Sequence, residues 1–167
     1  MSGNTKKLGG GIPYWHLCDG EGRLIVIGAP GVQAEETAND SDKTLTVPAD
    51  TWWTIKSIWI ELTTDATADD RQLQVDIRDG DSDVVFSMRV GNSQGASQTR
   101  YYALAAHLAD LAGFRDDGYL MTPFPELTIP EAWSIRIWDN KVVAVAADDM
   151  IVQVIVQART VLESVES

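Results

Sequence analysis

The chain has 167 residues, enough for one domain that buries a core of its own. Its 25 acidic residues outnumber the 13 basic ones and give a formal charge of −12, which argues against a broad contact with nucleic acid or an anionic membrane, because phosphates are bound by clustered Lys and Arg. The lone Cys18 excludes an internal disulfide, and no apolar run reaches the roughly 20 residues of a membrane-spanning helix.

Residues 1–22 differ in composition from the rest of the chain. They are rich in glycine and lack the apolar stretch of a secretory signal, so we expect synthesis in the cytoplasm without membrane passage. The segment is typical of an extended N-terminal arm, which divides the chain into an arm (1–22) and a folded domain (23–167). The arm has two alternatives: to fold back on its own domain, or to reach a neighbouring subunit. Its candidate contact residues are Leu8, Ile12, Tyr14 and Trp15.

Strand-like runs begin at residue 23. An apolar run at 23–29 is ended by Pro30 and Gly31, a polar connector follows at 31–42, and residues 43–50 alternate before another proline.

The next run, residues 51–64, changes parity partway along. Trp53 and Ile55 share one face of an ideal strand, whereas Ile58, Ile60 and Leu62 share the other. One extra residue, a β-bulge near Lys56 and Ser57, would turn both sets toward a single core. The run therefore predicts a curved sheet.

The remaining elements are mostly strands. Apolar and polar residues alternate at 71–80, as in a strand that buries only one face. A turn at 79–83 connects this strand to residues 84–90 in a predicted hairpin. Helical composition occurs at residues 101–113, where a strand followed by a short turn is the alternative. In the run 119–130, Pro123, Pro125 and Pro130 predict edge or loop geometry around 123–130. Residues 132–139 and 148–161 alternate again. About eight strands with at most one helix predict an all-β, antiparallel β-sandwich that is jelly-roll-like.

Catalytic and metal-binding patterns are weak. Neither His16 nor His107 lies in a nucleophile–base pattern, and His16 with Cys18 supplies too few ligands for zinc. We expect no enzyme activity, no cofactor and no metal. Aspartates at 79, 81 and 83 resemble the start of a calcium loop, but the glycine stands at the second position and no glutamate at the twelfth, which favours a hairpin tip.

Three further acidic pairs, at 69–70, 116–117 and 148–149, are typical of turns and strand starts. Carboxylates from separate loops at one end of a sandwich could still bind calcium. A carboxylate pair for glycoside hydrolysis also stays open, because the separation that matters is spatial.

Tryptophan positions suggest a contact surface. Trp53 and Trp133 share parity with apolar neighbours and are expected in the core, whereas Trp52, Trp59 and Trp138 fall on the opposite face. Exposed tryptophan is used to stack on sugars or to anchor protein interfaces, where it is enriched at energetic hot spots. The protein interface is favoured, because the chain also has an aromatic arm.

Residues 50–160 resemble a known family. The runs WTIKSIWIELTTDATADDRQLQVDIRDG, DGYLMTPFPELTIPEAWSIRIWD and AADDMIVQVIVQAR are similar to small virion proteins encoded among the head genes of tailed bacteriophages, associated with capsid decoration (cement). The resemblance implies a jelly-roll-like domain on the capsid exterior that ties subunits of the major capsid protein together, often as a homotrimer. The alternative function is a carbohydrate- or receptor-binding module of a phage fibre or tail.

Overall fold

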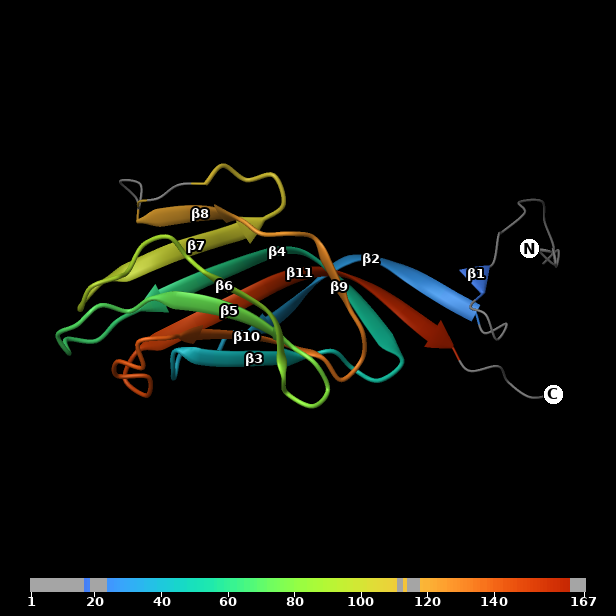
Figure 1. Ribbon diagram of the computed structural model, residues 1–167, viewed down its shortest axis with the longest axis horizontal. Coiled ribbons are helices and arrows are strands. Elements are labelled where there is room, and N and C mark those ends of the chain that lie inside the picture. Colours follow the sequence, from blue (N-terminus) through green and yellow to red (C-terminus); the bar gives the residue numbers. More distant parts are fainter. Residues whose placement is uncertain (1–16, 19–23, 111–112, 114–117, 163–167) are drawn as a thin grey trace.

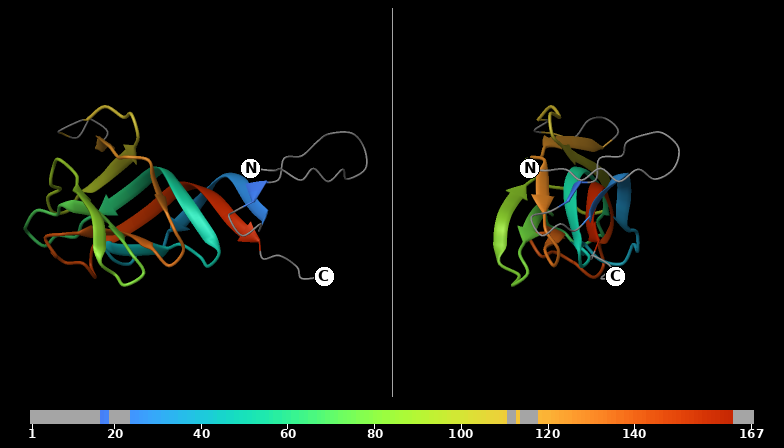
Figure 2. Two further views of the ribbon diagram at one scale, coloured as in Figure 1. Left: turned by 45° about the vertical axis from the view of Figure 1, so that its right-hand side comes forward. Right: turned by 90° about the vertical axis from the view of Figure 1, so that its right-hand side faces the viewer.

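The computed structural model describes residues 17–18, 24–110, 113 and 118–162, which form two β-sheets packed face to face (Figures 1 and 2). The seven-stranded sheet has the order β1-β2-β11-β4-β7-β8, with β9 also paired to β4. The four-stranded sheet has the order β3-β10-β5-β6. The strands are β1 (Leu17–Cys18), β2 (Leu24–Glu35), β3 (Asp42–Thr46), β4 (Thr51–Thr63), β5 (Leu73–Arg78), β6 (Val84–Arg89), β7 (Thr99–Ala105), β8 (Tyr119–Pro123), β9 (Leu127–Ile129), β10 (Ser134–Asp139) and β11 (Asp149–Leu162).

The strand order is that of a jelly roll. Strands β2, β11, β4 and β7 face β3, β10, β5 and β6. Along these eight strands the chain changes sheet at every step except the hairpin from β5 to β6, and β8 and β9 are inserted between β7 and β10. All pairs are antiparallel except β7 with β8. The predicted all-β, jelly-roll-like sandwich is confirmed, and the part of the chain that the structure describes contains no helix able to cross a membrane.

The predicted bulge in β4 is present. Ile155 of β11 lies opposite Ser57 and Val156 opposite Ile55, so Lys56 is the extra residue. Both apolar sets of β4, before and after Lys56, are consequently buried in one core. The bulge also marks a change of neighbour, because β9 pairs with β4 before it and β7 pairs with β4 after it.

The predicted helix at 101–113 is wrong, and the alternative of a strand is confirmed. Residues 99–105 form β7, which pairs with β4 on one side and β8 on the other. Tyr102 and Leu104 alternate into the core, and the chain then turns at His107, whose φ is 65°. Two neighbouring strands therefore override the helix propensity of the alanines.

The predicted end of the first strand at Pro30 is also wrong. Strand β2 continues through Pro30 and Gly31 to Glu35. Among the described residues, β2 pairs at Pro30 only with β11, so no described strand needs the missing N–H on the other edge. A register shift against Gln157 and Arg159 places an extra residue of β2 just before Pro30.

The hairpin of residues 71–90 is confirmed as β5 and β6, but β5 is not one-sided. Leu73, Val75 and Ile77 enter the core as predicted, whereas Gln74 and Asp76 on the opposite face are also buried. The cause is a polar network on the outer face of the four-stranded sheet, described below.

A buried ion pair closes one end of the sandwich. The guanidinium of Arg71 donates from Nε to Asp148 Oδ2 at 2.8 Å, and both side chains are fully buried. Arg71 Nη2 donates to Asp65 Oδ1 at 2.6 Å, and Nη1 donates to the carbonyl oxygens of Thr67 and Asp69. Arg71 thus joins the β4–β5 loop to the β10–β11 loop.

We predict that Arg71→Leu lowers the free energy of unfolding by about 3–5 kcal/mol, because Asp148 would remain buried without its cation. Urea unfolding followed by circular dichroism measures the loss. Lys141→Gln, which changes an exposed cation, serves as the control. The double variant with Asp148→Leu should recover part of the stability, and a loss in the double variant as large as in Arg71→Leu would contradict the assignment.

A second prediction concerns pH. Hydrogen bonds from the Thr67 hydroxyl and amide, assisted by Arg71, outweigh burial and lower the pKa of Asp65 below its ordinary value of 3.8. The stability contributed by Asp65 is therefore fully present above pH 3.8 and is lost as the pH falls through the lower folded-state pKa. The difference in melting temperature between wild type and Asp65→Asn should vanish in that acidic range, and a difference independent of pH would refute the role.

Candidate interaction surface

Several exposed apolar side chains of the seven-stranded sheet lie on its outer face, which points away from the four-stranded sheet. Arg159 lies opposite Ile27 on one side and Trp52 on the other, and Val32 lies opposite Ile155 in a parallel row. Ile27, Val32, Trp52 and Ile155 are 44%, 57%, 42% and 40% exposed. We call these four residues the outer stripe. Exposed apolar side chains that gather on one face of a sheet indicate a candidate site of contact with another molecule.

An aromatic row crosses the same face. Trp59, Tyr101 and Tyr119 come from β4, β7 and β8, with ring centroids 6.1 Å apart for the first pair and 4.7 Å for the second. With interplanar angles of 24° and 23°, both neighbouring pairs of rings are stacked. Trp59 therefore points outward as predicted but is half-buried, while Tyr119 is exposed.

Trp138 lies on the outer face of the other sheet and is also half-buried. Its indole Nε1 donates to Asp76 Oδ2 at 2.8 Å, and the guanidinium of Arg136 lies 4.3 Å from the centre of its ring. Arg136 Nε in turn donates to Asp42 Oδ1 at 2.8 Å. Trp138 is thus held by intramolecular contacts, unlike Trp52.

Asp76 is the centre of this polar network. Burial raises its pKa, but hydrogen bonds from Gln74, Ser87 and Trp138 outweigh burial and hold the pKa below the ordinary value of 3.8. The donors lie 2.7, 2.7 and 2.8 Å from its carboxylate oxygens, and Arg89 Nε donates to Gln74 at 2.9 Å. The network explains why β5 buries polar side chains on its outer face.

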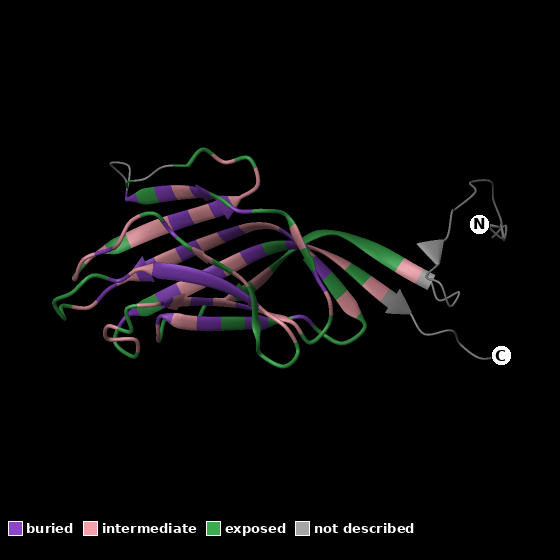
Figure 3. Cartoon of the chain, viewed as in Figure 1, coloured by how far each residue is buried: buried purple, intermediate pink, exposed green. Residues whose placement is uncertain are grey.

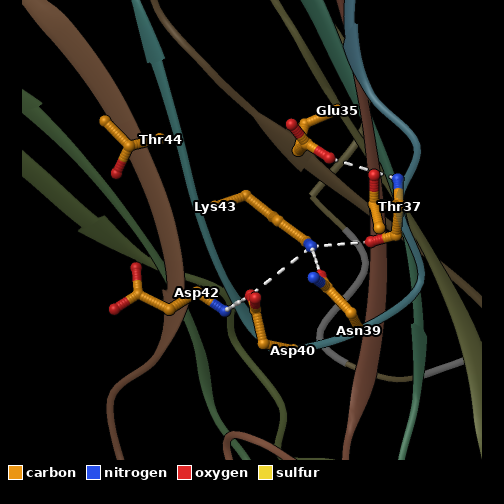
Figure 4. Close-up of a pocket in the computed structure, with 7 residues that line it drawn as sticks. All are labelled: Glu35, Thr37, Asn39, Asp40, Asp42, Lys43 and Thr44. Carbon is orange, nitrogen blue, oxygen red and sulfur yellow. Dashed lines mark hydrogen bonds and ion pairs between the residues drawn. The ribbon is translucent and has the colours of Figure 1, made fainter.

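A polar pocket of about 300 Å³ lies beside the β2–β3 connector (Figure 4). Its centre is Lys43, whose side chain is 3% exposed and whose Nζ donates to the Thr37 carbonyl at 2.7 Å and to Asn39 Oδ1 at 2.5 Å. Asp40 Oδ1 lies 3.4 Å from the same nitrogen. The connector therefore folds around the positively charged ammonium group of Lys43.

The acidic turns serve local structure. Asp79 Oδ1 accepts hydrogen bonds from the backbone amides of Asp81 and Asp83, as expected of a hairpin tip, and Asp148 pairs with Arg71. Within the described ranges, no three His, Cys, Asp or Glu side chains are grouped to hold a metal ion. The pair at 116–117 lies outside those ranges, as does His16.

The four arm candidates, Leu8, Ile12, Tyr14 and Trp15, also lie outside the described residues. From the predicted arm, Leu17 and Cys18 form β1, which pairs with Ile25 and Leu24 of β2.

Sequence reasoning missed Ile27 and Ile155, because each lies in a run that is apolar at most positions. It missed Val32 because that residue lies in the predicted polar connector at 31–42. The run at 24–27 has no polar alternation, a pattern typical of a strand covered on both faces. This lack of polar alternation is the sequence signal from which a contact surface on β2 could have been predicted.

No family model matches the chain, and no curated protein matches it. Solved structures of infectious bursal disease virus are similar to it: the Gx strain has a TM-score of 0.35 and 10% identity over 98% of this chain and 43% of that chain. A T13 viral particle of this virus has a TM-score of 0.33 and 12% identity over 96% of this chain and 41% of that chain. T=1 particles derived from a mutant of its VP2 protein have a TM-score of 0.29 and 8% identity over 96% of this chain and 46% of that chain. This chain spans less than half the length of each. The strand order, rather than these loose superpositions, defines the fold.

We predict that Asp76→Ala lowers the free energy of unfolding by about 1–3 kcal/mol, because Gln74, Ser87 and Trp138 lose a buried acceptor. Asp83→Ala at the exposed hairpin tip is the matched control and should be nearly neutral. In a double-mutant cycle with Trp138→Phe, measured by urea unfolding, the two losses should be less than additive. If the two losses add exactly, the hydrogen bond between Trp138 and Asp76 contributes nothing to the free energy of unfolding.

Proposed function

We propose that the chain is a non-enzymatic structural protein of a tailed-bacteriophage virion that decorates the capsid exterior and stabilises it by bridging subunits of the major capsid protein. The observation that supports the proposal best is the outer face of the seven-stranded sheet, where apolar and aromatic side chains lie with no further layer of the described residues over them. A structural protein that works by contact needs such a face.

The rest of the molecule fits this role. A jelly roll is an architecture of viral capsid proteins and of lectins. The acidic charge of −12 keeps a free protomer soluble and disfavours contact with the DNA that a capsid confines. The arm of residues 1–22 would extend the contact to a neighbouring subunit, and a homotrimer would present several such arms to the capsid.

The aromatic row favours a protein partner over the alternative, a carbohydrate-binding module. A sugar ring stacks on a free aromatic face, but Tyr101 stands between Trp59 and Tyr119 and is stacked with both. Tyr119 is exposed on β8, at the end of the sheet order, which supports a role as the side chain that enters a pocket of a capsid subunit.

We predict that Tyr119→Ala weakens binding to empty cognate capsids by about tenfold or more, since aromatic anchors dominate protein interfaces. Cosedimentation with capsids that lack the protein measures the affinity. Tyr119→Phe keeps the ring and should bind nearly as well as wild type.

Removal of residues 1–16, which leaves β1 intact, should also reduce occupancy on the capsid without unfolding the domain. Wild-type protein that fails to bind capsids at all would refute the proposed function. Normal occupancy after removal of residues 1–16 would refute only the role of the arm.

A further inference from the structure

The loop between β10 and β11 carries an apolar run at the surface. Residues 140–147 read NKVVAVAA, so every residue after Lys141 is apolar. Val142 is 66% exposed, and Ala146 and Ala147 are exposed as well. None of the eight residues is buried, and Figure 3 shows the loop in green and pink. A surface run of this kind is expected only where it makes a contact. We call residues 140–147 the apolar loop.

The backbone of the apolar loop adopts a conformation that its residues disfavour. Val142 has a φ of 57° and Ala144 a φ of 48°, both in the left-handed region. A β-branched residue is a rare outlier there, because this conformation brings Cβ close to the following carbonyl oxygen. Glycine or asparagine at position 142 would relieve the strain but would remove the apolar side chain. Strain retained for the sake of a side chain is typical of functional sites.

Two buried aspartates fix the two ends of the apolar loop. At the start, Asp139 accepts hydrogen bonds from the backbone amides of Lys141 at 3.0 Å and Val143 at 3.2 Å. At the end, Asp148 is the partner of Arg71 in the buried ion pair that closes the sandwich. The loop is therefore ordered before any contact forms, so that binding loses little conformational entropy.

We infer that the apolar loop is a second capsid contact, in which Val142 enters an apolar pocket of a different capsid subunit from the one that the outer face of the seven-stranded sheet binds. This contact rests on the proposed function and supplies the second surface that bridging requires. The loop precedes Asp149, and Arg159, which lies opposite Trp52, is ten residues further along β11. Because a strand rises about 3.3 Å per residue, about 30 Å of strand separates the two contacts. In Figure 1 the loop accordingly lies at the end of the sandwich away from the start of β2.

Charge favours a protein pocket with basic residues at its rim over a membrane. Asp149 follows the apolar loop directly and is exposed. Asp69 is also exposed, and its carbonyl accepts a hydrogen bond from Arg71, the residue that binds Asp148. Lys141 is the single cation of the loop. Segments that insert into membranes combine apolar with basic side chains, which bind anionic head groups. An apolar pocket ringed by Lys or Arg instead complements both the valine and the carboxylates.

Substitutions at position 142 should move stability and binding in opposite directions. Val142→Gly and Val142→Asn should raise the melting temperature, because both residues accept the left-handed conformation. Both should weaken binding to empty cognate capsids by about tenfold or more, because the contact loses a buried valine. Scanning calorimetry measures the melting temperature, and cosedimentation with capsids that lack the protein measures the affinity.

Two controls separate the contact from its side effects. Ala132→Gly changes another exposed left-handed residue, whose φ is 63°, and should raise the melting temperature while capsid binding stays at the wild-type level. Val85→Asn removes a valine that is 49% exposed on β6 of the four-stranded sheet, and it should bind capsids like the wild type. Val85→Asn is the matched control for Val142→Asn.

The outcomes distinguish this contact from the proposed function. Wild-type affinity of Val142→Gly would overturn the second contact and leave the proposed function, because the outer face of the seven-stranded sheet would then suffice. Weaker binding together with a lower melting temperature would also overturn it, since Val142 would then act through the fold. A wild type that does not bind capsids would overturn both.

Vesicles of phosphatidylcholine test the membrane as the partner. The wild type should stay in the supernatant when these vesicles are sedimented. Sedimentation of the wild type with the vesicles, but not of Val142→Gly, would overturn the second contact, because the apolar loop would then insert into a bilayer.

Discussion

The jelly roll depends on one extra residue, Lys56, in its central strand. Strand β4 pairs with β11 along its whole length, with β9 before the bulge and with β7 after it. Without the bulge, period-2 alternation would send either Trp53 and Ile55 or the later set Ile58, Ile60 and Leu62 to the outer face. The bulge removes that conflict and bends the strand where its neighbour changes. The same residue therefore places Trp52 and Trp59 outside.

The outer faces of the two sheets differ in which side chains make contacts within the protomer and which remain exposed. On the four-stranded sheet, Asp76 gathers Gln74, Ser87 and Trp138 into a closed set of hydrogen bonds. Arg71 does the same for the loops at one end of the sandwich. On the seven-stranded sheet, the outer stripe and the edge of the aromatic row remain exposed. Polar groups satisfied within the protomer stabilise the fold, and the apolar groups left over are available to partners.

Much of the fold was predictable from alternation. The runs at 51–64, 71–90 and 148–161 each have a clear apolar face, and each forms the predicted strand or hairpin. The failures lie where local signals compete with sheet position. Pro30 looks like a strand end but is tolerated on a free edge, and the alanines of 101–113 look helical but are paired on both sides in β7. The candidate surface was predictable only at its tryptophans. Ile27 lies in a run without polar alternation, Val32 lies in the predicted polar connector, and Ile155 is an apolar residue on the outer face of β11.

The parity of apolar residues by itself determined the sandwich, the bulge near Lys56 and the outward direction of Trp52, Trp59 and Trp138, because side chains alternate along any strand. Tertiary structure decided which of these three is available to a partner. Trp138 meets Asp76, which is 62 positions away, and Trp59 meets Tyr101 on a neighbouring strand, whereas Trp52 lies beside Arg159 and is 42% exposed. The physical reason is that strands far apart in the sequence supply the hydrogen bonds and stacking contacts, and no local pattern records them.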